Sequence, residues 1–154
     1  MSKIDLLDKK ILNIVTKNAR IPSKDVALEC GVSRAAIHQR LQRLQELRII
    51  TGSAYIVDPE SLGYTICAFI GLKIDAGIEA KDIAVALEAI PEVVGCHFTT
   101  GPYSLLIKMY AKGKRHLLEL LNDKIQRIPG IADKETMLSL EQTLDRQIEI
   151  NTDE

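Results

Sequence analysis

The chain has 154 residues, which suits one ordinary domain or two small ones. Apolar residues make up 46% of it and charged residues 27%, a mixture typical of globular proteins and unlike that of disordered chains. No apolar run reaches the roughly 18–20 residues that a membrane-spanning helix needs, and the first residues lack the apolar segment of a signal peptide. We therefore expect a soluble, cytoplasmic protein with no membrane partner.

Residues that usually carry metal, redox or nucleophilic chemistry are scattered. The three cysteines are odd in number and far apart, which argues against disulfides and CxxC sites. The three histidines have no metal-ligand spacing, and there is no Gly-rich phosphate loop, nucleophile elbow or catalytic pair of carboxylates. With no Trp and 4% aromatic residues, a stacking surface for single-stranded nucleic acid is not expected. We expect no catalytic residues, no metal and no cofactor.

Charge is distributed unevenly along the chain. Residues 1–60 carry ten Lys and Arg against seven Asp and Glu, a surplus of three positive charges. Residues 61–154 carry ten against fourteen, a surplus of four negative charges. This asymmetry favours a first part that meets a polyanion and a second part with a different task.

The first sixty residues predict three short helices. An apolar stripe places the first helix over residues 5–18, and Pro22 disfavours its continuation. Ser23 is a suitable N-cap for a second helix that ends at Gly31, and Ser33 is a suitable N-cap for the third. The third helix carries these apolar residues on one face: Ile37, Leu41, Leu44 and Leu47.

The join between the second and third helices predicts a helix-turn-helix. Ala27 is small where the helices would cross, Gly31 makes the turn, and Ile37 packs back into the crossing. The opposite face of the third helix is polar and flanked by arginines. This face suits a recognition helix, with its first residues against base edges and its arginines against phosphates. The predicted DNA-binding residues are Ser33, Arg34, Ala35, His38, Gln39, Arg40, Gln42 and Arg43.

A change of composition follows the third helix. Residues 49–57 are β-prone and contain a glycine, so we expect a short wing or strand there. Residues 58–63 have turn-forming composition and suit a linker. We place the boundary near residue 62, with a DNA-binding domain, wing and linker over residues 1–62 and a second domain over residues 63–154.

The second domain alternates strand and helix patterns in the order β-α-β-β-α-β, which is that of a ferredoxin-like fold. The whole chain is therefore expected to be α+β. The two helices would cover one face of the sheet, and the other face is apolar enough to need a second subunit. The predicted elements span residues 65–74, 79–90, 93–100, 104–111, 114–128 and 131–140.

A helix-turn-helix followed by a βαββαβ domain, at this size, resembles the Lrp/AsnC (feast/famine) family of prokaryotic transcription regulators. The resemblance covers nearly the whole chain. Its hairpin, Thr99-Thr100-Gly101-Pro102-Tyr103-Ser104, is most like that of the asparagine-responsive branch, in which Ser follows Tyr. The other segments that carry the resemblance are Leu7-Asp8-Lys9-Lys10-Ile11-Leu12, Val32-Ser33, Ile49-Ile50-Thr51-Gly52, Asp58-Pro59, Leu62-Gly63 and Glu135-Thr136.

The resemblance implies partners and an effector site. It implies double-stranded DNA as a partner, subunits paired through their sheets, dimers assembled into an octamer, and a small effector, usually an amino acid, bound between dimers. Where the asparagine-responsive branch has Gln, this chain has Leu140-Glu141, and a carboxylate there favours a cationic or amino-bearing group, which leaves the effector's identity open. Carried over by motif, the effector-binding residues are Gly101, Pro102, Tyr103, Ser104, Thr136 and Glu141.

Two other functions stay open at this point. An architectural DNA-binding protein would bind with tolerance of sequence, strong salt dependence and little response to an effector. Some proteins that resemble this family are haem-pathway decarboxylases, in which we expect a degraded DNA-facing helix and clustered His and Arg in the second domain. Here the recognition helix keeps Arg34, Arg40 and Arg43, so we expect a regulator and not an enzyme.

Overall fold

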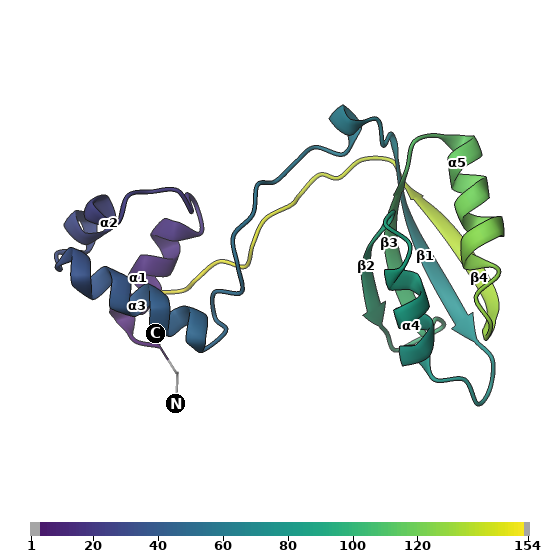
Figure 1. The fold of residues 1–154 in the computed structure, drawn as a ribbon, viewed down its shortest axis with the longest axis horizontal. Helices are drawn as coiled ribbons and strands as arrows, with labels where there is room; N and C mark the ends of the chain where they lie inside the picture. Colours follow the sequence, from purple (N-terminus) through teal and green to yellow (C-terminus); the bar gives the residue numbers. More distant parts are fainter. Residues whose placement is uncertain (1–3, 153–154) are drawn as a thin grey trace. The chain divides into compact units, whose positions relative to one another are not determined.

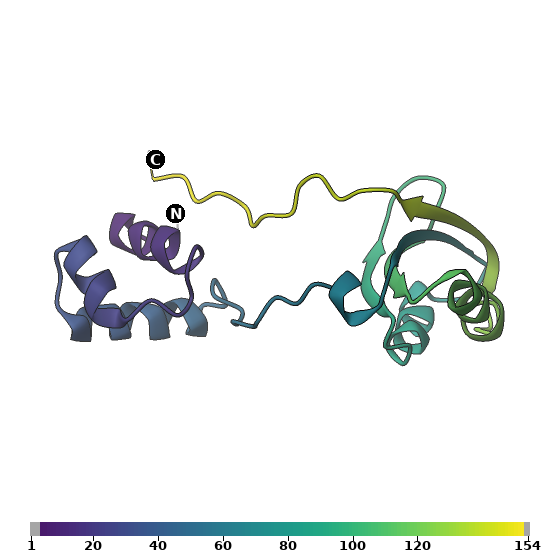
Figure 2. The same cartoon turned by 90° about the horizontal axis from the view of Figure 1, so that it is seen from above.

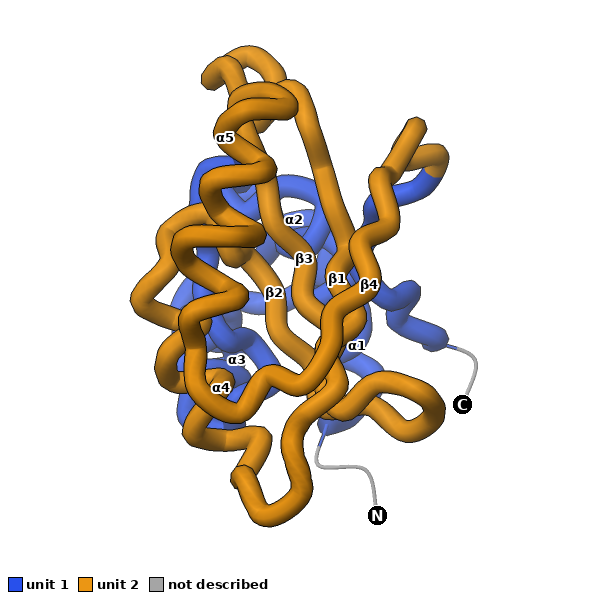
Figure 3. The backbone as a smooth tube through the Cα atoms, turned by 90° about the vertical axis from the view of Figure 1, so that its right-hand side faces the viewer, with its two compact units in different colours: residues 1–56, 144–154 blue, residues 57–143 orange. Residues whose placement is uncertain are grey.

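The computed structural model describes residues 4–152. The chain divides into two compact units, residues 1–56 with 144–154 and residues 57–143 (Figure 3). The last residues thus group with the first unit, whereas the sequence analysis assigns them to the second domain. One contact that ties them there is a hydrogen bond of 3.2 Å from the side-chain amide of Asn13 to the backbone carbonyl of Ile150.

The first unit contains three helices joined by short turns (Figure 1): α1 (Leu6–Val15), α2 (Ser23–Cys30) and α3 (Arg34–Glu46). A capping box begins α1, in which the carboxylate of Asp5 accepts the N–H of Asp8 and the carboxylate of Asp8 accepts the N–H of Asp5. Gly31 ends α2 with a φ of 68°, a left-handed conformation that costs glycine little. The tight turn makes α2 and α3 a helix-turn-helix.

The predicted packing of α2 against α3 is confirmed. Ala27 on α2 is buried, and Ile37 on α3 is fully buried in the same cluster as Ile11 and Val26. Fully burying one side chain of this size contributes about 1.5–3 kcal/mol to folding. The small side chain of Ala27 lets the two helices approach, and the larger apolar residues fill the space around the crossing.

The two predicted serine caps differ in outcome. The hydroxyl of Ser33 accepts the N–H of Ala36 at 3.1 Å and caps α3 as predicted. The prediction for Ser23 is wrong, because this residue is already the first of α2 and Pro22 precedes it without a side-chain cap. Proline suits the start of a helix through its fixed φ, but its ring has no polar atom to offer the orphan N–H groups.

The predicted wing is also wrong. Residues 47–58 contain no strand. After α3 ends, Arg48 takes a positive φ of 55°, and the chain continues without regular structure, with Tyr55 and Ile56 exposed. A β-prone composition is not sufficient for a strand, because the backbone N–H and C=O groups need a partner strand and no described strand pairs with this segment.

The second unit is a four-stranded antiparallel sheet with strand order β2-β3-β1-β4, which confirms the ferredoxin-like prediction. A short 3-10 helix precedes the sheet, and the last helix continues from α5 into the π-helical segment η2. In chain order the elements are η1 (Glu60–Leu62), β1 (Ile66–Ile74), α4 (Ala80–Glu88), β2 (Val93–Phe98), β3 (Leu105–Ala111), α5 (Lys114–Glu119), η2 (Leu120–Ile125) and β4 (Ile131–Ser139).

Both helices lie on one face of this sheet, as predicted (Figure 2). Alternate residues of β3 are buried beneath them, while Leu106, Lys108 and Tyr110 point to the open face. In the last helix Leu118 is 57% exposed, whereas Leu120 is fully buried. The buried stripe follows helical spacing through Leu117, Leu120, Leu121 and Ile125.

Candidate DNA-binding and effector-binding sites

The polar face of α3 is exposed at most of its predicted DNA-contacting positions. Arg34 lies in the first helical turn, directly after the Ser33 cap. Gln42 lies two turns further on and donates a hydrogen bond of 3.1 Å to the carboxylate of Glu46. The exposed members of the predicted set are Ser33, Arg34, Ala35, His38, Gln39, Gln42 and Arg43, and Arg40 is half-buried.

Arg40 and Arg43 are held by Asp8 of α1, and Arg40 also by Asp5, the N-cap of that helix. Asp8 is 0% exposed, and one of its carboxylate oxygens lies 3.1 Å from a terminal nitrogen of Arg40 while the other lies 3.0 Å from a terminal nitrogen of Arg43. Arg40 also pairs with Asp5. Its guanidinium lowers the pKa of the Asp5 carboxyl, and hydrogen bonds to both carboxylates raise the pKa of Arg40.

The role of Asp8 was not predicted from the sequence. One signal was available, because Asp8 lies three residues before Ile11 and four before Leu12, on the side of the helix that is otherwise apolar. A carboxylate on the buried side of a helix needs cationic or N–H partners. Here both kinds are present, since Asp8 accepts the N–H of Asp5 as well as the two guanidinium groups.

The hairpin between β2 and β3 is fixed by hydrogen bonds to backbone carbonyls. The N–H of Ser104 donates to the carbonyl of Leu72 at 2.9 Å, and the hydroxyl of Thr99 donates to the carbonyl of Tyr103 at 2.8 Å. Gly101 takes a φ of 100°, which strongly favours glycine. Within residues 4–152, the N–H groups of Gly101 and Tyr103 donate to no other residue.

The ring of Tyr103 lies directly against Gly71 in β1. A Cβ atom on Gly71 would stand 2.5–2.7 Å from three ring carbons, so only glycine leaves room for the ring there. The phenol donates a hydrogen bond to the carboxylate of Glu135, which lies opposite Gly71 in the pairing of β1 with β4. This hydrogen bond raises the pKa of Tyr103. From the sequence, Gly71 was given no role, and Glu135 was named only among the segments that carry the family resemblance.

The predicted effector-binding residues do not all come together in one chain. Thr136 lies opposite Ile70, whose side chain is buried on the helix side of the sheet, so Thr136 points to that side as well. Tyr103 and Glu135 lie on the open side. Glu141 follows the end of β4 and is exposed. One chain therefore presents Gly101, Pro102, Tyr103 and Ser104 together, with Thr136 and Glu141 apart from them.

The open face of the sheet carries apolar side chains without a cover in the described chain. Phe69, Leu106 and Tyr110 are half-buried, and Met137 is 39% exposed. The ammonium of Lys108 lies 5.9 Å from the ring centre of Phe69 and 5.4 Å from that of Tyr110. Such cation–π contacts occupy the aromatic faces but leave the surface around them apolar.

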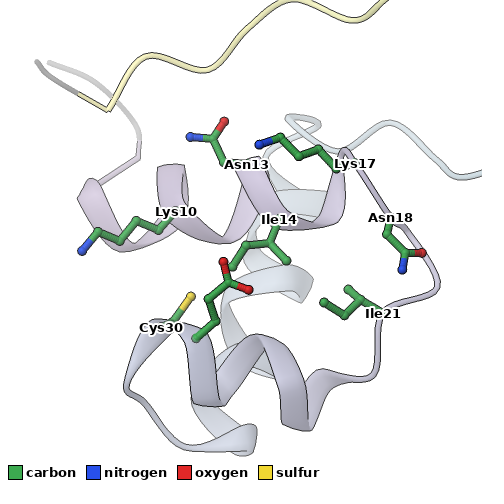
Figure 4. A pocket seen from close by; sticks show the side chains of 8 residues that line it. Lys10, Asn13, Ile14, Lys17, Asn18, Ile21 and Cys30 are labelled. Carbon is green, nitrogen blue, oxygen red and sulfur yellow. The ribbon is translucent and has the colours of Figure 1, made fainter.

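A pocket of about 460 Å³ lies elsewhere, between α1 and α2 (Figure 4). Asn13 at its rim already binds the carbonyl of Ile150. None of the predicted site residues lines this pocket, so it is separate from both candidate sites. Its lining consists of Lys10, Asn13, Ile14, Lys17, Asn18, Ile21, Glu29 and Cys30.

Residues 4–152 contain neither a cluster of metal-binding side chains nor a membrane-spanning helix. No three His, Cys, Asp or Glu side chains gather in a way that could hold a metal ion. No helix there is long and apolar enough to cross a membrane.

Both parts of the chain match known protein domains. Residues 4–45 match the AsnC-type helix-turn-helix domain, and residues 67–148 match the Lrp/AsnC ligand binding domain. The regulatory protein AsnC of Haemophilus influenzae is 37% identical over 148 residues, which cover 96% of this chain and 99% of that protein. The structure of Escherichia coli AsnC matches with a TM-score of 0.87 at 36% identity, over 96% of this chain and 99% of that chain.

A third similar protein shares the fold at lower identity. It is a transcriptional regulator of Neisseria meningitidis, solved in complex with L-methionine, with a TM-score of 0.88, 23% identity and 94% coverage of each chain. The two domain matches and the AsnC relatives agree with the helix-turn-helix of α2 and α3 and with the four-stranded sheet of the second unit. The chain therefore belongs to the Lrp/AsnC family of DNA-binding transcriptional regulators, with this family's helix-turn-helix domain followed by its ligand-binding domain.

Proposed function

We propose that this regulator binds pseudo-palindromic DNA as a dimer, and that an amino acid bound at the hairpin changes its assembly or its affinity for DNA. One observation carries the proposal: a single chain joins an exposed, polar recognition helix to a ligand-binding domain whose hairpin is rigidly held. The recognition helices of a dimer would enter successive major grooves about 34 Å apart. A coupling of ~1–3 kcal/mol between effector and DNA suffices for a useful switch.

The first turns of α3 supply the side chains for reading bases. Arg34 can contact guanine edges, and Gln39 and Gln42 can contact adenine edges. Both types are exposed, and Arg34 has no ion-pair partner in the part of the chain that the structure describes. The proposed DNA-binding surface consists of Ser33, Arg34, Ala35, His38, Gln39 and Gln42, and Arg40 and Arg43 are considered separately below.

The hairpin supplies groups that suit an amino acid. The N–H groups of Gly101 and Tyr103 suit its carboxylate, and the carboxylate of Glu135 suits its ammonium group. Ser104 adds a hydroxyl beside them. Thr136 and Glu141 lie apart from this group in one chain, so in this proposal a second subunit contributes them.

The apolar open face supports pairing of two subunits through their sheets. A second copy would cover Phe69, Leu106 and Tyr110, which a single chain leaves open. We place four such dimers in an octamer, as the family resemblance implies, and place the protein in the cytoplasm with the chromosomal DNA. The protein acts in this proposal by binding and not by catalysis, in line with relatives that are named regulators.

Calorimetric titration with individual L-amino acids tests the effector part of the proposal. We expect at least one to bind the wild type, and Ser104→Ala to weaken that binding by about 10- to 100-fold, because a hydrogen bond to a charged group is worth about 1.5–3 kcal/mol. Ser53→Ala, in the irregular segment after α3, is the matched control and should bind as the wild type does. Failure of every amino acid to bind the wild type would show that the effector is of another class.

A further inference from the structure

A buried carboxylate joins the first helix to the recognition helix. Asp8 is fully buried, and its two oxygens receive guanidinium nitrogens from Arg40 at 3.1 Å and Arg43 at 3.0 Å. Asp5, whose side chain is 53% exposed, pairs with Arg40 from the outer side. The two arginines are three residues apart on α3, so both extend from one face of the helix toward α1.

We propose that Asp8, supported by Asp5, determines the DNA specificity of this regulator by withholding the charges of Arg40 and Arg43 from the phosphate backbone. The inference rests on DNA binding by α3 and adds a specificity-determining role for residues that do not contact DNA. Arg40 and Arg43 then position the recognition helix on α1, and Arg34 and the exposed glutamines make the contacts that differ between sequences.

The charge balance of the cluster supports this role. Two carboxylates and two guanidinium groups sum to zero, so the cluster presents no net charge to an approaching phosphate. A phosphate would have to compete with a carboxylate that is already desolvated and that also caps α1. Binding to any DNA sequence depends on phosphate contacts, whereas discrimination depends on base contacts. Withholding two arginines therefore lowers the affinity for every sequence, so that base contacts supply a larger share of the binding free energy.

The salt dependence of binding to a duplex of scrambled sequence measures this effect directly. Each arginine that contacts a phosphate changes the slope of log K against log salt by about 0.9. We expect Arg40→Gln to leave the wild-type slope nearly unchanged. We expect Asp8→Asn to steepen the slope by about 0.9 for each arginine released, which equals about a 3.5-fold greater loss of affinity between 50 and 200 mM salt. Adding Arg40→Gln to Asp8→Asn should then remove one such increment.

Two further variants keep the test decisive. Asp5→Asn changes an exposed residue and should weaken the hold on Arg40 alone, which keeps its pair with Asp8, so we expect a smaller increase than for Asp8→Asn. This variant keeps the proposal testable if Asp8→Asn does not fold. Asp25→Asn, on exposed α2 surface, changes the net charge equally without touching either arginine. The same increase in Asp25→Asn would overturn the proposal, because net charge alone would then explain it.

DNA binding by the wild-type protein distinguishes a failure of this inference from a failure of the proposed function. If it binds scrambled DNA and Arg40→Gln lowers its slope by about 0.9, the arginine contacts phosphate and the inference is wrong while DNA binding stands. If the wild type binds no DNA even at low salt, DNA binding by α3 fails, and the inference fails with it.

Discussion

The ring of Tyr103 packs directly against the backbone of Gly71, which has no side chain to keep it away. The ring occupies the space where any other residue would place its Cβ, and its phenol reaches Glu135 on the neighbouring strand. The hairpin that resembles the family's effector site is thereby fixed to the middle of the sheet. The sequence pattern did not predict the contacts of Tyr103 with Gly71 and Glu135. Gly71 lies within an otherwise continuous β-prone run, and Glu135 has the character of a surface residue.

Gly71→Ala should displace the Tyr103 ring and abolish the response of DNA binding to amino acids. The clash at 2.5–2.7 Å is with the ring itself, and overpacking of this kind costs about 1–3 kcal/mol. Gly95→Ala is the matched control, because its Cβ would stand 3.6 Å from that of Lys108, an ordinary contact. Chemical denaturation and DNA binding with pooled amino acids measure the two effects. A normal amino-acid response in Gly71→Ala would contradict the proposed role of Tyr103.

The raised pKa of Tyr103 gives a prediction about pH. Because the phenol donates to Glu135, the protonated form is favoured in the folded state. The stabilisation is therefore complete below the ordinary tyrosine pKa and is lost as the pH rises through the higher folded-state pKa. Ultraviolet titration of tyrosinate should show one of the four tyrosines ionising late, and Glu135→Gln should move it to lower pH. Glu141→Gln is the control, and an unchanged titration in Glu135→Gln would exclude this hydrogen bond in solution.

At the scale of the elements, the serines at the starts of α2 and α3 differ, although the sequence predicts both as helix caps. We expect Ser33→Ala to lower the free energy of unfolding of the first unit by about 1 kcal/mol, because the N–H of Ala36 loses its acceptor. Ser23→Ala should change it by much less, because Ser23 makes no cap. Denaturation followed by helical circular dichroism measures both. Equal losses in the two variants would contradict this assignment of the caps.

The elements that sequence patterns predicted well are those whose partners are implied by the pattern itself. The spacing of Ala27, Gly31 and Ile37 encodes the helix crossing, and alternation in β3 encodes which face is buried. The wing over residues 49–57 was predicted from composition alone and is absent, since a strand depends on a partner elsewhere in the chain. The ion pairs of Asp8 with Arg40 and Arg43 were not predicted for a related reason. Local sequence patterns carry little information about ion pairs between residues far apart in the chain.

At the scale of the whole molecule, the proposal depends on a second copy of the chain. The open sheet face is apolar at Phe69, Leu106 and Tyr110, and the predicted effector residues are divided between two sides of the sheet. Both features are explained if two subunits pair through their sheets and further subunits complete the effector site. The apolar pattern of the strands predicted that the open face needs a second subunit, and the family resemblance implied an effector site between dimers.

Phe69→Asp should therefore dissociate the assembly. A carboxylate on this face would be desolvated in the dimer even with Lys108 on the strand opposite, and the cost of burying that charged pair exceeds the gain from covering one aromatic ring. Leu118→Asp is the control, because Leu118 is 57% exposed on the helix side of the sheet. Sedimentation velocity at micromolar concentration should show a smaller species only for Phe69→Asp. An unchanged sedimentation coefficient for this variant would place the interface elsewhere.

The most direct test of a ligand-responsive regulator is binding of the purified wild-type protein to DNA from upstream of its own gene. The measurement uses scrambled DNA as competitor and is made with and without a pool of amino acids. We predict that the protein prefers the upstream DNA and that the pool shifts its affinity. Tight binding to every sequence with no response to the pool would instead indicate an architectural DNA-binding protein. Failure to bind any DNA at low salt would contradict the central claim that the protein regulates transcription by binding DNA through α3.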